Sequence, residues 1–170
     1  MSAHVAIGLG ANLGDPFAAL RAAIDAIDAL PTTRALVASD FYLTAPVGGP
    51  GGQPDYVNAA LLVETSLAPR ALLRELQRIE LEAGRVRTVR DGPRTLDLDI
   101  LWWEGRVIGE PDLQVPHPRL MERRFALEPL LDVLPEPGFA EALAALGDQG
   151  VRRLGPIADA TIGAIFPDEG

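Results

Sequence analysis

The sequence predicts an α+β fold, in which helices pack on an antiparallel β-sheet. Short apolar segments with strand character and segments with apolar residues at helical spacing follow one another as strand, helix, strand, strand, helix, strand. This βαββαβ order is the ferredoxin-like layout, with the helices on one face of the sheet, and additions follow at the C-terminal end. The 170 residues contain no internal repeat and no linker, so we expect one domain over residues 1–170.

The first half of the chain supplies a strand, a helix and a second strand. Residues 4–11 are apolar and lead into the turn-forming ANLGDP, which favours a short buried strand. Asp15 followed by Pro16 predicts a helix start, because Asp can cap the first turn and Pro lacks an N–H that would need a partner there. The helical spacing ends at Pro31, and residues 35–44 predict the second strand.

A loop and a third strand come next. Residues 45–55 (APVGGPGGQPD) are dominated by glycine and proline and predict a long loop. Such loops in compact domains often carry function, and a floppy insertion is the alternative. Residues 56–66 predict a strand whose odd-numbered residues from 57 to 63 form the core face, with Tyr56 and Asn58 on the other face.

The second helix and a fourth strand complete the pattern. Pro69 opens the helix and Gly84 is placed to end it. An arginine-rich connection, residues 85–94, leads to the last strand of the layout. Residues 104–136 favour a hairpin, a proline-bounded turn and a short helix, whereas the tail, residues 139–170, stays unassigned.

Two aspartates alternate with apolar residues in GPRTLDLDIL, residues 92–101. In a strand, Leu96, Leu98 and Ile100 would share one face, and Asp97 and Asp99 would share the other. Carboxylates at positions i and i+2 lie roughly 7 Å apart on one side of a pleated strand. Such a pair either faces water or holds something positive.

An arginine cluster directly precedes these acids. Arg85, Arg87, Arg90 and Arg94 fall within ten residues of an otherwise acidic chain. Guanidinium groups bind phosphate oxygens through paired hydrogen bonds, and carboxylates bind Mg²⁺, so the combination indicates a polyphosphate–magnesium site. The alternative is an exposed strand face on which Asp and Arg residues pair with one another.

Composition excludes several other classes. The net charge of −9 argues against broad electrostatic binding to nucleic acid or anionic membranes, and the absence of cysteine removes thiolate chemistry. The sequence has no GxxxxGK[ST] loop, which excludes a P-loop nucleotide site. The N-terminus lacks a signal-peptide pattern and no apolar run approaches the length of a membrane span, so we expect a cytoplasmic protein.

A few polar and aromatic residues outside the acid strand are further candidates. His117 lies between two prolines with arginines nearby, which favours a phosphate contact, although a lone histidine is often structural. Asn58 offers an amide with donor and acceptor for the edge of a heterocycle. Tyr56 and Phe125 stand beside polar residues, and either can be a core residue.

Five segments of the sequence resemble the 6-hydroxymethyl-7,8-dihydropterin pyrophosphokinases of folate biosynthesis. They stand in the family's order and cover about residues 5–135: GANLGD, FYLTAPVGGPGGQPDYVNAA, QRIELEAGRVR, GPRTLDLDIL and VPHPRLMERRFALEPL. The resemblance implies transfer of the β,γ-pyrophosphoryl group of ATP to the hydroxymethyl oxygen of the dihydropterin, with release of AMP. It also implies small-molecule substrates and no nucleic-acid or membrane partner, and we expect a monomer.

The resemblance assigns roles to individual residues. It implies that Asp97 and Asp99 hold two Mg²⁺ ions, which orient an in-line attack. The arginines that assist the transfer would be Arg85 and Arg94. Residues around the phosphates and the nucleotide would be Arg87, His117, Arg123, Gln77 and the backbone of Ile100. The pterin would lie between Tyr56 and Phe125, with its edge bonded by Asn58 and the backbone at Thr44 and Val47.

The chain departs from the family's pattern at three places. Asp91 stands where some members have an aromatic residue, in a loop that is one residue short, Pro118 replaces a tyrosine, and Arg124 occupies a position that is often small. Two rival functions use the same sheet. A regulatory ligand-binding module would have no reason to keep acids of this kind beside arginines. An RNA-binding sheet would carry strand-centre aromatics and a basic surface, but aromatic residues make up only 5% of this acidic chain.

Overall fold

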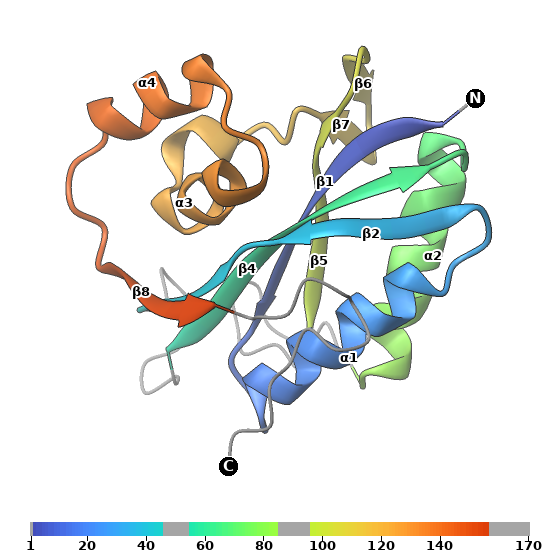
Figure 1. Ribbon diagram of the computed structural model, residues 1–170, viewed down its shortest axis with the longest axis horizontal. Coiled ribbons are helices and arrows are strands. Elements are labelled where there is room, and N and C mark those ends of the chain that lie inside the picture. Colours follow the sequence, from blue (N-terminus) through green and yellow to red (C-terminus); the bar gives the residue numbers. More distant parts are fainter. Residues whose placement is uncertain (1, 46–54, 85–95, 157–170) are drawn as a thin grey trace.

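A central sheet organises the chain in the computed structural model, which describes residues 2–45, 55–84 and 96–156 (Figure 1). Its elements, in order, are β1 (Ala3–Ala11), α1 (Pro16–Asp28), β2 (Thr33–Ala38), β3 (Asp40–Thr44), β4 (Tyr56–Thr65), α2 (Pro69–Glu82), β5 (Asp97–Trp103), β6 (Ile108–Glu110), β7 (Leu113–Val115), a 3-10 turn (Leu120–Glu122), α3 (Arg124–Val133), α4 (Pro137–Ala145) and β8 (Val151–Pro156). Strands β6 and β7 form a separate hairpin.

The main sheet confirms the ferredoxin-like layout. Its strand order is β5-β1-β4-β3-β8, with β2 also paired to β4, and every pairing is antiparallel. The predicted strand over residues 35–44 is two strands, because Ser39 interrupts it. The buried Ser39 hydroxyl accepts a hydrogen bond from the Ala60 N–H at 2.8 Å, so the side chain replaces part of the missing strand ladder.

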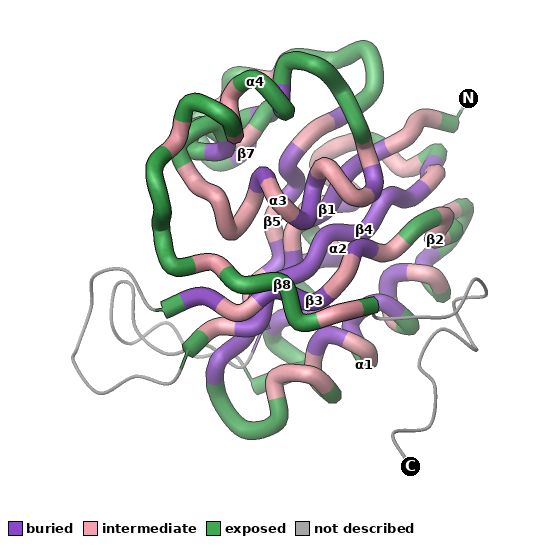
Figure 2. Tube along the Cα trace, turned by 60° about the vertical axis from the view of Figure 1, so that its left-hand side comes forward, coloured by how far each residue is buried: buried purple, intermediate pink, exposed green. Residues whose placement is uncertain are grey.

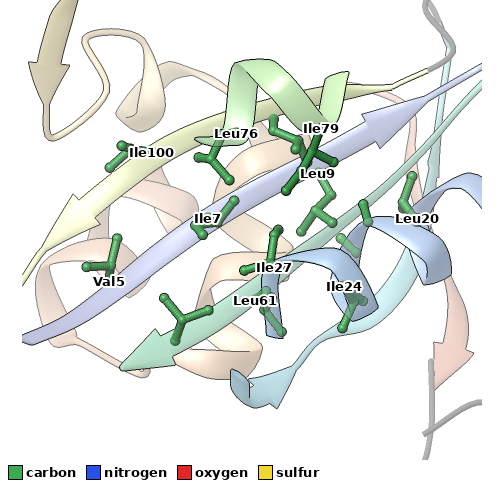
Figure 3. Close-up of a cluster of buried hydrophobic side chains, with 14 of the residues drawn as sticks. Val5, Ile7, Leu9, Leu20, Ile24, Ile27, Leu61, Leu76, Ile79 and Ile100 are labelled. Atoms are coloured by element: carbon green, nitrogen blue, oxygen red, sulfur yellow. The ribbon is translucent and has the colours of Figure 1, made fainter. Parts of the chain in front are cut away.

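One face of the sheet carries the main core. Helices α1 and α2 pack there, and Figure 3 shows their aliphatic side chains meeting those of β1, β4 and β5. Leu98 and Ile100 belong to this cluster, and so do the odd-numbered residues of β4 from Val57 to Val63, as predicted. The Asp15 side chain caps α1 by accepting from the Ala18 N–H at 3.1 Å, which confirms the predicted helix start.

The opposite face carries a second, smaller core beneath α3 and α4. Leu127, Leu130 and Phe139 pack there against Ala60 and Leu101 of the sheet. The ferredoxin-like layout predicts only the helices of the first face, so this layer comes from the C-terminal additions. In Figure 2, much of α4 and β8 is exposed, whereas β1 and β4 are largely buried.

The tail left unassigned from the sequence contributes a strand. Strand β8 pairs with β3, and Val151 lies opposite Thr44. Arg153 anchors it, because its guanidinium contacts Asp40 at 2.5 Å and Asp132 at 3.0 Å. Among the described residues, no helix is both long and apolar enough to cross a membrane.

Candidate active site

A floor of bare backbone lies on the α3 side of the sheet, where three strands run side by side. Gly10 of β1 is paired with Asn58 of β4 on one side and with Asp97 of β5 on the other. Gly8 likewise lies between Ala60 and Asp99. Because neighbouring strands are about 4.8 Å apart, the backbones at Asn58 and Asp97 lie roughly 10 Å from each other across the sheet. Gly10, which stands between them, carries no side chain.

This floor forms the base of a cleft of about 560 Å³. The cleft takes residues from both ends of the C-terminal helical layer as well as from the sheet. Its walls include Thr44, Ala45, Tyr56, Asn58, Asp97, Asp99, Leu101, Arg119, Glu122, Arg123, Phe125, Ala126 and Gln149. Acidic groups therefore line one side of the floor, and aromatic and amide groups line the other.

The acid pair points into this cleft because of the strand's alternation. Leu98 is buried in the core on the opposite face, which leaves Asp97 and Asp99 on the cleft face. After Ile100, a bulge inserts Leu101, since Ile7 pairs with Ile100 but Ala6 pairs with Trp102. The prediction that the two carboxylates share one side of a strand is confirmed.

A buried carboxylate of α2 holds the outer edge of this strand. The Leu98 N–H donates to the Glu80 carboxylate at 2.8 Å, and Glu80 is only 4% exposed. Among the described residues, strand β5 has no neighbouring strand on that side, so Glu80 supplies an acceptor that a further strand would otherwise provide. The contact fixes the backbone between Asp97 and Asp99.

His117 lies beside the second acid. Its Nε2 is 4.0 Å from the Asp99 carboxylate, and its Nδ1 accepts from the Arg119 N–H at 3.3 Å. The His117 backbone N–H donates to the Leu101 carbonyl at 3.0 Å, which ties it to the bulge. Burial lowers the pKa of His117 from its ordinary value of 6.5, and the positive charge of Arg123 lowers it further.

The other end of the cleft carries the amide and the aromatic residues. Asn58 is 6% exposed, and its side-chain nitrogen donates to the Thr44 hydroxyl at 3.0 Å, which fixes the orientation of its amide. Tyr56 and Phe125 both line the cleft. The Arg123 guanidinium lies over the Phe125 ring, 5.3 Å from the ring centre.

The structure brings most of the described site residues to this cleft or its rim. Gln77 is exposed on α2 and the Ile100 side chain is buried in the main core, so neither side chain lines the cleft. The remaining predicted site residues lie outside the described part of the chain: Val47, Arg85, Arg87 and Arg94.

Several residues that position or line the site were missed from the sequence, and the most consequential are Gly8, Gly10, Glu80 and Gln149. Gly8 and Gly10 sit at alternate positions of the first strand, a pattern that leaves a sheet face bare. Glu80 stands four residues after Leu76 on the apolar side of its helix, so an acid at a core position was the available signal. Gln149 lines the cleft from the tail, where no motif marks it.

The donor set fits a magnesium ion that is held together with phosphates. In the described part of the chain, no group of three or more His, Cys, Asp or Glu residues gathers to hold a metal. Mg²⁺ prefers oxygen ligands and is usually bound by one or two carboxylates, with water and substrate phosphates as its other ligands. Asp97 and Asp99 match that requirement, and Asp99 has 46% of its side chain exposed.

Known proteins resemble the chain in both sequence and fold. The profile of the 7,8-dihydro-6-hydroxymethylpterin-pyrophosphokinase (HPPK) family matches residues 6–135. A Pseudomonas aeruginosa protein named 2-amino-4-hydroxy-6-hydroxymethyldihydropteridine pyrophosphokinase is 44% identical over 160 residues, covering 91% of this chain and 98% of that protein. A Haemophilus influenzae protein of the same name is 48% identical over 127 residues, 75% of this chain and 79% of that protein.

Solved structures show the same fold. A crystal structure described as HPPK-DHPS in complex with substrates superposes with a TM-score of 0.69 over 95% of this chain. The chain spans about half of that longer protein, 48% of its length, and the two sequences are 12% identical in the matched part. At this identity, the likeness concerns the fold alone.

Proposed function

The chain belongs to the 7,8-dihydro-6-hydroxymethylpterin-pyrophosphokinase family, and from this premise we propose how its residues perform the reaction. The protein transfers pyrophosphate from ATP to the hydroxymethyl group of 6-hydroxymethyl-7,8-dihydropterin, in folate biosynthesis. The activity expected from the sequence motifs is therefore confirmed, and a non-catalytic regulatory module is not favoured.

The bare floor of the cleft carries our assignment of the substrates. We place the flat pterin at the end with Tyr56, Phe125 and the Asn58 amide, and the triphosphate at the end with Asp97 and Asp99. An aromatic ring offers stacking, and a fixed amide offers a donor and an acceptor to the ring edge. The glycine backbone between the two ends leaves space for the hydroxymethyl group to approach the phosphates.

The transfer itself needs positioning and charge more than covalent chemistry. The hydroxymethyl oxygen bonds to the β-phosphorus of ATP and gives up its proton to water, the bond from that phosphorus to the α–β bridging oxygen breaks, and AMP leaves with that oxygen. We propose that Asp97 and Asp99 hold two Mg²⁺ ions, which would offset the charge of the triphosphate when bound. Arg123 adds positive charge from the cleft wall.

The remaining assignments rest on the sequence motifs. We propose that Arg85 and Arg94 assist the transfer, and that further contacts to the nucleotide and phosphates come from Arg87, Gln77, His117 and the Ile100 backbone. Backbone groups at Thr44 and Val47 would complete the contacts to the pterin edge. A single domain over residues 1–170, a monomeric state and a cytoplasmic location stay predictions.

The acid pair gives the direct test. Purified protein is incubated with ATP, Mg²⁺ and 6-hydroxymethyl-7,8-dihydropterin, and AMP formation is followed by chromatography. We expect Asp97→Asn and Asp99→Asn each to abolish AMP formation while the thermal unfolding curve is retained. Asp25→Asn, an exposed change on α1, serves as the matched control and should keep full activity. Activity retained in both cleft variants would refute the metal assignment, and no AMP from the unmodified protein would refute the function.

A further inference from the structure

The segment after α4 makes a set of contacts that the proposed reaction does not use. The Arg124 guanidinium donates to the Gly147 carbonyl at 2.6 Å and to the Leu146 carbonyl at 2.9 Å, and it reaches the Leu143 carbonyl at 3.4 Å. These carbonyls stand at or just beyond the C-terminal end of α4, where helix carbonyls run out of partners, and the Leu143 carbonyl also accepts from the Leu146 N–H at 3.1 Å. Arg124, which departs from the family's pattern, thus holds the start of the tail against the start of α3.

Gln149 extends this contact into the cleft. Its side-chain oxygen accepts from the Arg124 N–H at 2.9 Å, and its side-chain nitrogen donates to the Glu122 carbonyl at 3.0 Å. One side chain therefore spans the backbone on both sides of Arg123. Gln149 also lines the cleft together with Phe125.

The same segment is tied to the opposite wall two residues later. Val151 begins β8 and pairs with Thr44, whose hydroxyl accepts from the Asn58 amide at 3.0 Å. Arg153 fastens β8 to Asp40 of β3. Residues 149–151 consequently join the segment that carries Phe125 to the strand end that carries Thr44, and both segments line the pterin end of the cleft. The course of the chain from α4 to β8 can be followed in Figure 1.

We propose that Gln149 is a positioning residue for the pterin site, through which the C-terminal segment holds the two walls at a fixed separation. The inference rests on the proposed function and extends it to residues beyond the 6–135 region that matches the family. Both polar atoms of the Gln149 amide bind backbone, so Gln149 acts through Arg123 and Phe125. A pre-formed wall strengthens binding because little order is lost when the substrate enters.

The test compares Gln149→Leu, which keeps the size of the side chain and removes both hydrogen bonds, with Asp148→Ala. Asp148 is the matched control, since its carboxylate bonds only locally to the Gly150 N–H at 2.8 Å in the contacts described. For each protein, the Kd of the dihydropterin is measured by calorimetry with a non-hydrolysable ATP analogue and Mg²⁺. The KM values of both substrates and the melting temperature are measured alongside.

We expect Gln149→Leu to raise the pterin Kd and KM about fivefold, with the KM for ATP changed less than about twofold and the melting temperature lowered by no more than about 2 °C, because Gln149 is exposed and its bonds are individually weak. Asp148→Ala should leave all four quantities unchanged. In a Phe125→Leu background, the effect of Gln149→Leu on pterin binding should shrink, because the residue it positions is gone.

Two results would overturn the inference while leaving the proposed function intact. One is a pterin Kd within twofold of that of the unmodified protein. The other is an equal weakening of pterin and nucleotide binding together with a large drop in melting temperature, which would mark Gln149 as merely structural. If the unmodified protein binds no dihydropterin, the proposed function fails first and the inference falls with it.

Discussion

Replacing Gly10 by alanine tests the bare floor of the cleft directly. A Cβ added at Gly10 would lie 3.0 Å from the Asn58 side-chain oxygen, and ordinary contacts begin at 3.4 Å. The Asn58 amide must therefore move by about 0.4 Å, although it is 6% exposed and bonded to Thr44. The change acts on the residue that we place against the pterin edge.

Two effects of Gly10→Ala on the free energy of unfolding partly offset each other. Overpacking a buried site destabilises by about 1–3 kcal/mol, whereas replacing glycine by alanine in a strand stabilises by about 0.5–1 kcal/mol. We expect a net loss of about 1 kcal/mol, which lowers the melting temperature of a domain this size by about 2–4 °C. Loss of a neutral hydrogen bond to the pterin, about 1.4 kcal/mol, would raise the pterin KM about tenfold.

Steady-state kinetics and thermal unfolding of the same preparation separate these two effects. Gly138→Ala is the matched control, because nothing lies within 4 Å of a Cβ at that position in α4. We expect the control to keep both KM values. An unchanged pterin KM in folded Gly10→Ala protein would refute the argument that the Asn58 amide hydrogen-bonds the pterin edge and that Gly10 leaves the space for it.

Two further predictions concern groups beside the acid strand. Glu80→Ala should lower the free energy of unfolding by about 1–3 kcal/mol, because the Leu98 N–H loses a buried acceptor. Glu80→Gln should recover part of this loss. Equal urea midpoints for Glu80→Ala and the unmodified protein would contradict the prediction. In the metal-free protein, proton NMR should show His117 titrating below 6.5, with His117→Asn assigning its signal among the two histidines. As the pH falls, His117 binds a proton in the unfolded chain at a higher pH than in the folded protein, so the free energy of unfolding should decrease below about pH 6.5. A measured pKa of His117 at or above 6.5 in the folded protein would show this reasoning to be wrong.

The fold was largely predictable because local signals agree with the sheet. The Asp15–Pro16 helix start and the alternation around Leu98 each specify one structure, and the structure confirms both. The break at Ser39 was not predictable, since it depends on a hydrogen bond to Ala60, a residue 21 positions away. Strand β8 was missed for a similar reason: four of its six residues are exposed, and its pairing with β3 gives no apolar pattern.

The parts of the site that depend on residue type could be predicted from the sequence. The parts that depend on how backbone segments are placed in the fold could not. Asp97 and Asp99 are recognisable in the sequence as a pair of acids in an apolar segment, and family motifs imply roles for Asn58 and Phe125. The importance of Gly10 appears only from its register between two strands. Gln149 belongs to a segment whose contribution depends on contacts to Glu122 and Arg124, which lie more than 20 residues earlier in the chain.

The glycine floor also bears on inhibitors of this enzyme and on how resistance to them could arise. A flat inhibitor resting on Gly10 would contact main-chain atoms, which mutation cannot replace. A side chain added at Gly10 would meet the Asn58 side-chain oxygen at 3.0 Å, so a resistance mutation that fills this space would also weaken binding of the pterin. Resistance mutations should therefore fall at the rim of the cleft. Compounds that contact only the glycine floor should lose less affinity through such mutations.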